Sequence, residues 1–364
     1  MEKVATAQLV WEKMMNHQPV IISGPCSAET EEQLLETALQ LAKTGKIDLL
    51  RAGIWKPRTK PGNFEGVGVV GLPWMQKARK LTGIPFTVEV ANAQHVDEAL
   101  KFGADILWLG ARTTVNPFSV QEIADALRGV EVPVMIKNPI NPDLNLWLGG
   151  IERLQKVGIK QVGAIHRGFS SFGATEYRNK PMWHIPIELK RLRPELPIIC
   201  DPSHICGRRD TLLPVAQKAA DLDFNGLMLE AHITPDEAWS DAKQQITPEA
   251  LSELLDKVVW RKEKADQEEV TNDLAKFREQ INQIDDELLA LLGDRMKVAE
   301  KIGLYKKEHN LTILQTHRWN DVLNQGVEKG RKKGLSKKFV TKYLDAVHIE
   351  SINRQDAVMN KEEK

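Results

Sequence analysis

Short runs of β-branched and aliphatic residues alternate with amphipathic segments from about residue 19 to residue 262. The apolar runs predict strands at 20–25, 48–54, 85–90, 105–110, 133–138, 161–167, 197–201 and 226–231. The amphipathic segments predict helices at 31–43, 74–81, 95–102, 120–127, 151–157 and 211–220. Eight strand–helix units in about 240 residues predict an α/β protein folded as a (β/α)8 TIM barrel. An open doubly wound sheet is disfavoured because no glycine-rich dinucleotide motif follows the first strand.

The pattern changes after the barrel. Residues 263–271 are charged and lack strand periodicity, so they predict a linker between a barrel domain (1–262) and a second domain (272–364). Asn272 is a suitable N-cap for a long helix, and two further helices are expected from near Thr316 and from Ser336. Apolar residues recur along the first helix at steps of three and four, as in a coiled coil: Leu274, Phe277, Ile281, Ile284, Leu288, Leu291, Val298, Ile302 and Tyr305. We therefore expect an all-α, three-helix second domain.

The composition excludes several classes of function. The 364 residues include 50 basic and 50 acidic ones, a balance that argues against general binding to nucleic acid or to membranes. No apolar run approaches the roughly 20 residues of a membrane span. The three cysteines form no CxxC pair and no signal peptide is evident, so we expect a cytoplasmic protein. The basic stretch 330–338 is interpreted as a solvated turn.

The predicted strand ends carry reactive side chains, and TIM barrels place their chemistry at these ends. Several of them are cations: Arg51 with Lys56 and Arg58, Arg112, Lys137 and Arg167. Converging Arg and Lys side chains repel one another unless they bind anions. The pattern therefore predicts a pocket for phosphate or carboxylate groups.

Other strand ends carry a mixed set of sulfur, nitrogen and oxygen ligands: Cys26, His204, Glu230 and Asp241. Such a set suits Mn, Fe, Co or Zn better than Mg or Ca. His232 is an alternative ligand, because it shares a strand face with Glu230. Cys200 and Cys206 are interpreted as buried or loop thiols, and His166 as a structural residue on the opposite strand face.

Several motifs together resemble one enzyme family: Gly24-Pro-Cys-Ser27, Lys56-Pro-Arg-Thr59, Gly110-Ala-Arg112, Lys137, His166-Arg-Gly168, Asp201-Pro-Ser-His204, Gly207-Arg-Arg209 and Glu230. Residues 1–262 resemble the type Iβ 3-deoxy-D-arabino-heptulosonate 7-phosphate synthases, which condense phosphoenolpyruvate with erythrose 4-phosphate. The resemblance implies a divalent metal, with Mn expected, held by Cys26, His204, Glu230 and Asp241. It also implies substrate contacts from Arg51, Lys56, Pro57, Arg58, Thr59, Glu89, Arg112, Lys137, Arg167 and Asp201, with Lys56 also a candidate proton donor.

A related synthase offers a second interpretation of the barrel. The octulosonate 8-phosphate synthases use the same fold with a five-carbon sugar phosphate, but Pro57 and Arg58 favour the four-carbon substrate. Many relatives carry a ferredoxin-like regulatory module before the barrel. Here only about 18 residues precede the first predicted strand, so control of the synthase is expected to come from elsewhere.

The second domain carries its own cations. At about 100° per residue, Arg278, Arg295 and Lys306 form a line beside the apolar seam of the first helix. Ser351 and Gln355 lie four residues apart on the apolar stripe of the third helix. This face has the charge to bind a dianion. The alternative is an amphipathic dimerisation hairpin with snorkelling cations.

Residues 272–359 resemble the all-helical chorismate mutases. The resemblance implies rearrangement of chorismate to prephenate without a cofactor, by Arg278, Arg295, Lys306, Arg318, Ser351 and Gln355. It also implies a homodimer in which Arg278 reaches the partner's site. Gln315 and Trp319 depart from the Asp and Glu that are common in the family.

Together the two resemblances predict a bifunctional enzyme of aromatic amino-acid synthesis. Prephenate or chorismate bound by the helical domain is expected to inhibit the barrel reaction. The alternative is a noncatalytic helical domain that serves only in regulation and dimerisation.

Overall fold

The computed structural model describes residues 2–56, 62, 64–173, 176–261 and 268–360. The chain divides into two compact units, Met1–Glu263 and Lys264–Lys364. Among the described residues, no helix is long and apolar enough to cross a membrane.

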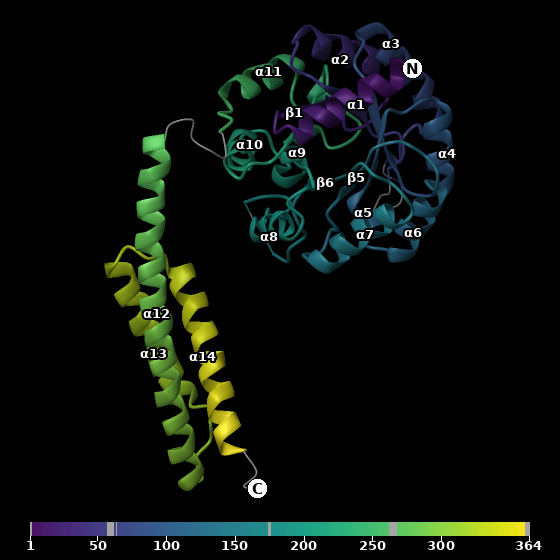
Figure 1. Ribbon diagram of the computed structural model, residues 1–364. Coiled ribbons are helices and arrows are strands. Elements are labelled where there is room, and N and C mark those ends of the chain that lie inside the picture. Colours follow the sequence, from purple (N-terminus) through teal and green to yellow (C-terminus); the bar gives the residue numbers. More distant parts are fainter. Residues whose placement is uncertain (1, 57–61, 63, 174–175, 262–267, 361–364) are drawn as a thin grey trace. The chain divides into compact units, whose positions relative to one another are not determined.

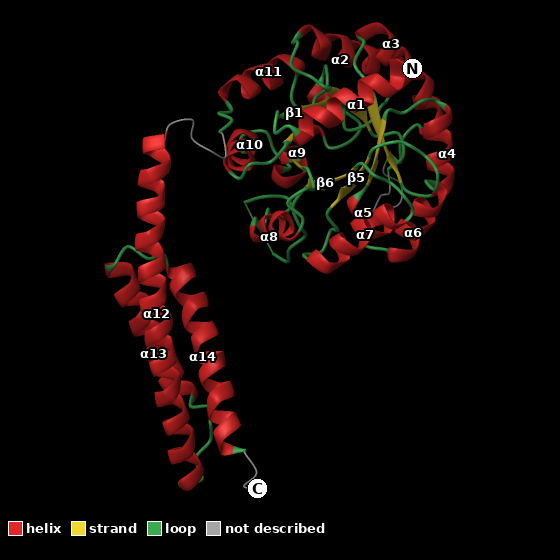
Figure 2. Ribbon diagram, viewed as in Figure 1, coloured by secondary structure: helices red, strands yellow, loops and turns green. Residues whose placement is uncertain are grey.

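Eight parallel strands close into a barrel in sequence order, with the last strand pairing with the first (Figure 2). They are β1 (Val20–Gly24), β2 (Leu49–Ala52), β3 (Phe86–Val90), β4 (Ile106–Leu109), β5 (Val134–Lys137), β6 (Val162–His166), β7 (Ile198–Cys200) and β8 (Gly226–Glu230). Each lies within a range predicted from the apolar runs. The TIM-barrel prediction is therefore confirmed.

Helices surround the barrel (Figure 1). They are α2 (Glu31–Lys43), α3 (Gly71–Thr82), α4 (Ala93–Lys101), α5 (Ala111–Thr114), α6 (Pro117–Ala126), α7 (Leu144–Lys156), α8 (His184–Leu192), α9 (Pro202–Cys206), α10 (Leu212–Asp221) and α11 (Pro248–Lys257), with short 3-10 turns at Gly68–Val70, Pro235–Glu237 and Ala242–Gln244. Thr30 is the N-cap of α2, where its side chain accepts a hydrogen bond from the backbone amide of Gln33. Asp143 is the N-cap of α7 and accepts in the same way from the backbone amide of Leu146. Such caps satisfy amides that lack partners within the helix.

A further helix, α1 (Glu2–Met15), closes the amino end of the barrel. Its apolar face packs with inward-facing strand residues, including Ile106, Met135 and Met228, in one buried cluster. The side chain of Asn225, just before β8, donates to the Met14 carbonyl at 2.9 Å. Because α1 fills this end, the barrel axis is open to a substrate at the opposite, carboxyl end in the part of the chain that the structure describes.

The second unit contains α12 (Glu268–Glu308), α13 (Thr316–Lys332) and α14 (Lys337–Met359). Thr316 begins α13, and Ser336 caps α14 by accepting from the Phe339 amide at 3.2 Å, as expected. The prediction that Asn272 caps α12 is wrong because the helix begins at Glu268 and includes Asn272. Helix α12 therefore extends into the predicted linker.

Candidate functional site

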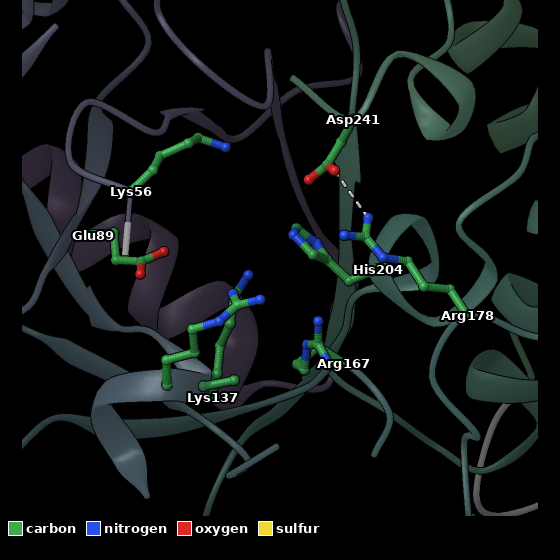
Figure 3. A pocket seen from close by; sticks show the side chains of 9 residues that line it. Lys56, Glu89, Lys137, Arg167, Arg178, His204 and Asp241 are labelled. Carbon is green, nitrogen blue, oxygen red and sulfur yellow. Dashed lines mark hydrogen bonds and ion pairs between the residues drawn. The ribbon is translucent and has the colours of Figure 1, made fainter. Parts of the chain in front are cut away.

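A strongly charged pocket lies where the carboxyl ends of the strands meet (Figure 3). Its lining residues come from strand ends and from the segments that follow the strands: Lys56, Glu89, Ala111, Arg112, Lys137, Arg167, Arg178, His204 and Asp241. The labelled side chains in Figure 3 extend toward a common space. The pocket therefore brings cations and metal-binding residue types together.

Three of the four expected metal ligands form one tight group. The ligand atoms of Cys26, Glu230 and Asp241 all lie within 4.8 Å of one another. Cys26 Sγ is 3.4 Å from Asp241 Oδ2, and His204 Nε2 is 3.7 Å from Glu230 Oε1. Atoms at such separations can share one ion, because metal–ligand bonds are about 2.0–2.3 Å long. The residues thus fit a divalent transition metal.

Asp201 orients the imidazole of His204. Asp201 is the N-cap of α9 and accepts from the His204 amide at 3.1 Å, while its Oδ2 lies 2.8 Å from His204 Nδ1. With Nδ1 directed at a carboxylate, Nε2 is left to bind a metal. Burial lowers the pKa of His204, against the opposing effect of Asp201. The imidazole is therefore neutral near pH 7, as a metal ligand must be.

Cations surround the anionic ligands. Burial, with a further contribution from Glu230, raises the pKa of Cys26 to about 12, although Lys56 Nζ lies 2.6 Å from the sulfur. Burial also opposes ionisation of Glu230, but His204 and Arg51 outweigh it and lower the pKa of that carboxyl. A bound divalent ion would stabilise the thiolate, because it adds positive charge beside the sulfur.

The remaining cations of the pocket are crowded together and largely buried. Lys137 Nζ donates to Asp201 at 3.0 Å, and the Arg167 side chain is only 7% exposed. Burial, together with the nearby Arg178 and Arg112, lowers the pKa of Arg167 to about 10. A phosphate or carboxylate in the pocket would relieve this crowding of positive charge.

A second group of polar residues lies in the helical unit. Arg295 on α12 donates to Ser351 Oγ on α14 at 2.5 Å, and the Gln355 amide donates to the Ser351 carbonyl at 3.2 Å. Lys306 is 8% exposed and donates to the Ile313 carbonyl at 2.5 Å. Burial lowers the pKa of Lys306. Four expected mutase residues thus lie on two packed helices.

The other two expected mutase residues, Arg278 and Arg318, are exposed. Arg278 precedes Arg295 by 17 positions on the same helix, a rise of about 25 Å. Trp319 stacks on His348 of α14, with ring centroids 4.0 Å apart and an angle of 5° between the ring planes. The departure at position 319 therefore places an aromatic pair beside the helix face of Ser351.

Comparisons with known proteins identify the families of both domains. Residues 12–268 match the DAHP synthetase I family. The chain belongs to that family. Residues 277–356 match chorismate mutase type II. This DAHP synthetase I family member therefore joins two enzyme domains of aromatic biosynthesis, and both predicted memberships are confirmed.

Individual relatives of this family member support the barrel assignment. A phospho-2-dehydro-3-deoxyheptonate aldolase of Thermotoga maritima is 32% identical over 243 residues, which cover 67% of this chain and 70% of the relative. A 2-dehydro-3-deoxyphosphooctonate aldolase of Vesicomyosocius okutanii is 26% identical, covering 68% and 92%. The crystal structure of the Thermotoga maritima DAHP synthase aligns with a TM-score of 0.59 and 31% identity, over 65% of this chain and 67% of that one.

Sequence reasoning missed two residues of the DAHP synthetase site, Arg178 and Trp108. Arg178 donates to Asp241 Oδ1 at 3.0 Å and to Gln244 at 2.7 Å. Trp108 lies inside the barrel, with the Arg51 guanidinium 5.1 Å and Lys137 Nζ 5.7 Å from its ring centre. Arg178 does not directly follow a strand. An inward-facing tryptophan such as Trp108 cannot be distinguished from an ordinary core residue in the sequence. Neither carried a local sequence signal.

The other predicted residues of this DAHP synthetase divide between positions outside the pocket and positions in its lining. His232 is outside the ligand group, since its Nε2 lies 3.4 Å from Glu29 and its Nδ1 accepts from the Thr234 amide. His166 contacts the rings of Phe169, Trp183 and Phe224. Cys200 and Cys206 are buried free thiols. Glu89 lines the pocket and accepts from Trp108 Nε1 at 3.1 Å. Pro57, Arg58 and Thr59 lie outside the described residues.

Proposed function

We propose that the barrel catalyses a metal-dependent condensation of phosphoenolpyruvate with erythrose 4-phosphate. The observation that carries this proposal is the convergence of Cys26, Glu230, Asp241 and His204 beside a cationic pocket. A neutral imidazole, a thiol and two carboxylates suit a divalent transition metal such as Mn, Co, Fe or Zn, and the resemblance to the synthases favours Mn.

The chain's own residues bind and orient the substrates. Arg112, Lys137 and Arg167 hold the phosphate and carboxylate of phosphoenolpyruvate, while the metal, when bound, supplies a Lewis acid for the aldehyde. Carbon 3 of phosphoenolpyruvate attacks the aldehyde carbon, and Lys56 Nζ, which also lines the pocket, protonates the resulting alkoxide to give the new hydroxyl. Water adds at carbon 2 and loses one proton. The second proton is lost as phosphate leaves with the C–O bond electrons, which forms the keto group.

The choice of sugar tests the barrel proposal. After EDTA treatment and addition of Mn²⁺, loss of phosphoenolpyruvate absorbance is followed with erythrose 4-phosphate and with arabinose 5-phosphate. Metal-dependent turnover with the four-carbon sugar is expected. Turnover with only the five-carbon sugar would assign the barrel to the octulosonate reaction, which the second relative catalyses according to its name.

We propose that the helical domain rearranges chorismate to prephenate. Arg295, Lys306 and Gln355 surround a face able to bind two carboxylates and the ether oxygen, so the reaction needs positioning and charge stabilisation but no cofactor. Arg295→Ala should abolish chorismate loss, while the exposed Lys297→Ala on the same helix serves as a matched control. If the wild-type protein consumes no chorismate, the domain is a binding module.

We propose that the helical domain also forms a homodimer. Leu274, Phe277, Ile281 and Ile284 on α12 are 44–60% exposed and form an apolar stripe. Arg278 on the same segment lies too far along α12 to join the Arg295 group of its own chain, so it would complete the partner's site. Ile281→Glu should yield a monomer by sedimentation at micromolar concentration. A wild-type monomer that still converts chorismate would refute the dimer.

Regulation follows from this fusion. We propose that prephenate or chorismate bound in the helical domain inhibits the barrel reaction. The support is the dianion-binding character of the Arg295 and Lys306 face. Synthase kinetics should change at saturating prephenate in the wild type and not in Arg295→Ala. Unchanged wild-type synthase kinetics would rule out this inhibition.

We propose a cytoplasmic location for the protein. The three free cysteines support it, because free thiols are typical of proteins in a reducing compartment.

A further inference from the structure

Two loops that carry metal ligands are fastened together by side chains. One is the segment 26–29 after β1, and the other is the segment 239–245 after β8. Three contacts join them: Cys26 N donates to Gln245 Oε1 at 2.8 Å, Ser27 Oγ lies 2.6 Å from Ser240 Oγ, and Trp239 N donates to Glu29 Oε1 at 2.7 Å. These three contacts are called the clasp.

The clasp is buried. Ser27 and Gln245 are fully buried, and Ser240 and Glu29 are 5% and 6% exposed. Gln245 uses both ends of its amide, because Nε2 also donates to the Ser240 carbonyl at 2.9 Å. Hydrogen bonds excluded from water are costly to leave unmade. The two loops are therefore held in one arrangement.

Glu29 is itself held in place by a second contact. Its Oε2 lies 3.4 Å from His232 Nε2, while His232 Nδ1 accepts from the Thr234 amide at 2.9 Å. Since Nδ1 accepts, Nε2 carries the proton and lies beside the Glu29 carboxylate. The residue considered as an alternative metal ligand thus serves to secure the clasp.

The clasp encloses the pair of ligands contributed by the two loops. Cys26 begins one segment, and Asp241 lies between Ser240 and Gln245 in the other, with the sulfur 3.4 Å from Asp241 Oδ2. Asp241 has φ of +50°, in the left-handed region that non-glycine residues seldom adopt. Surrounding contacts must maintain such a conformation, and the clasp provides contacts on both sides of it.

We propose that the clasp sets the spacing of Cys26 and Asp241, so that Gln245 is a positioning residue for the metal. This inference rests on the proposed metal dependence of the barrel. Gln245 neither lines the charged pocket nor belongs to the ligand group, but it fixes the backbone of Cys26 and the loop of Asp241. In other proteins, hydrogen bonds that hold the metal-ligating residues in place contribute strongly to metal affinity.

The test compares two buried amides at opposite ends of the barrel. Gln245→Ala breaks the clasp, whereas Asn225→Ala removes a similar bridge, between the Ile198 amide and the Met14 carbonyl, at the amino end. Mn²⁺ affinity is measured by chelator competition. Co²⁺ binding is followed by thiolate-to-metal charge-transfer absorbance, which reports ligation by Cys26.

Gln245→Ala should raise the Mn²⁺ dissociation constant roughly 10- to 100-fold and weaken the Co²⁺ band. Asn225→Ala should lower the melting temperature and leave both metal readouts unchanged. Wild-type affinity in Gln245→Ala would overturn the clasp inference while leaving the proposed function intact. A wild-type chain that binds neither ion would overturn both.

If Gln245→Ala does not fold, a second pair of variants with smaller changes provides the test. Ser27→Ala removes one clasp contact, and Thr37→Val removes a buried hydroxyl that donates to the Gln33 carbonyl in α2. Ser27→Ala should raise the dissociation constant by about fivefold, while Thr37→Val leaves it unchanged. Equal affinity in the two variants would overturn the inference.

Discussion

Arg51 Nη1 donates to Glu230 Oε1 at 3.1 Å, and both side chains are almost fully buried, at 3% and 0% exposed. The same carboxylate oxygen lies 3.7 Å from His204 Nε2. Arg51 therefore balances the charge of a proposed metal ligand from inside the barrel. A buried carboxylate without such a partner would be strongly unfavourable.

Arg51→Met should lower the free energy of unfolding by about 3–5 kcal/mol, because it leaves the Glu230 charge buried and unpaired. The double variant Arg51→Met/Glu230→Gln should recover part of that loss. Lys77→Met, which breaks an exposed pair with Glu31, is the control and should change stability by less than about 1 kcal/mol. Equal losses for Arg51→Met and Lys77→Met in urea unfolding would contradict this account.

Cys26→Ser should lower metal affinity and synthase activity together, because it replaces the sulfur ligand with a weaker oxygen donor. Cys206→Ser is the matched control: Cys206 is also buried, but its sulfur contacts the Thr211 carbonyl rather than the ligand group. Both variants are titrated with Mn²⁺ while turnover is recorded. Full activity of Cys26→Ser in metal-depleted buffer would rule out this ligand.

His166 should make stability depend on pH. Burial, with help from the charge of Arg167, lowers its pKa from the ordinary 6.5 to about 3. The unfolded chain therefore takes up a proton below pH 6.5 that the folded chain excludes until about pH 3. Stability is complete above pH 6.5 and falls by up to about 1.4 kcal/mol per pH unit below it.

His166→Phe should remove this contribution, so its free energy of unfolding should vary less between pH 6.5 and pH 4.5 than that of the wild type. The exposed His184→Phe variant also removes one imidazole and serves as the control. Urea unfolding at several pH values provides the comparison. Parallel curves for wild type and His166→Phe would contradict the assignment.

Replacing either of two glycines on α12 by alanine should have opposite effects, because one is crowded and the other is not. A Cβ at Gly303 would lie 2.6 Å from Val358 Cγ2 and 2.9 Å from Gln355 Cα, so Gly303→Ala should push α14 away and reduce mutase activity. A Cβ at Gly293 meets no atom within 4 Å, so Gly293→Ala should stabilise the helix by roughly 0.5–1 kcal/mol. Thermal unfolding and chorismate consumption separate the two. Normal activity in Gly303→Ala would show that this contact tolerates expansion.

The barrel strands could be predicted because each is a continuous apolar run between polar segments, as buried parallel strands require. The same rule placed Cys26, Asp201 and Glu230 at the correct end of the barrel, since parallel strands bring their carboxyl ends together. The helix start at Asp201 could also be predicted, because Asp-Pro-Ser-His combines an N-cap residue with a proline at the first helical position. The same motif contains His204.

Residues whose role depends on distant partners could not be predicted. Arg178 meets Asp241 across 63 positions, and Gln245 meets Cys26 across 219. Nothing in the neighbouring sequence marks either residue as part of the site. Helix α1 was missed because its burial depends on the open end of the barrel, which exists only after all eight strands have paired.

The closure of the barrel by α1 has a consequence for synthesis on the ribosome. Met14 emerges long before Asn225, whose side chain binds the Met14 carbonyl, and β1 cannot pair with β8 until still later residues appear. The apolar face of α1 and one edge of β1 therefore stay uncovered during most of translation. The nascent barrel should depend on chaperones until its eighth strand leaves the exit tunnel.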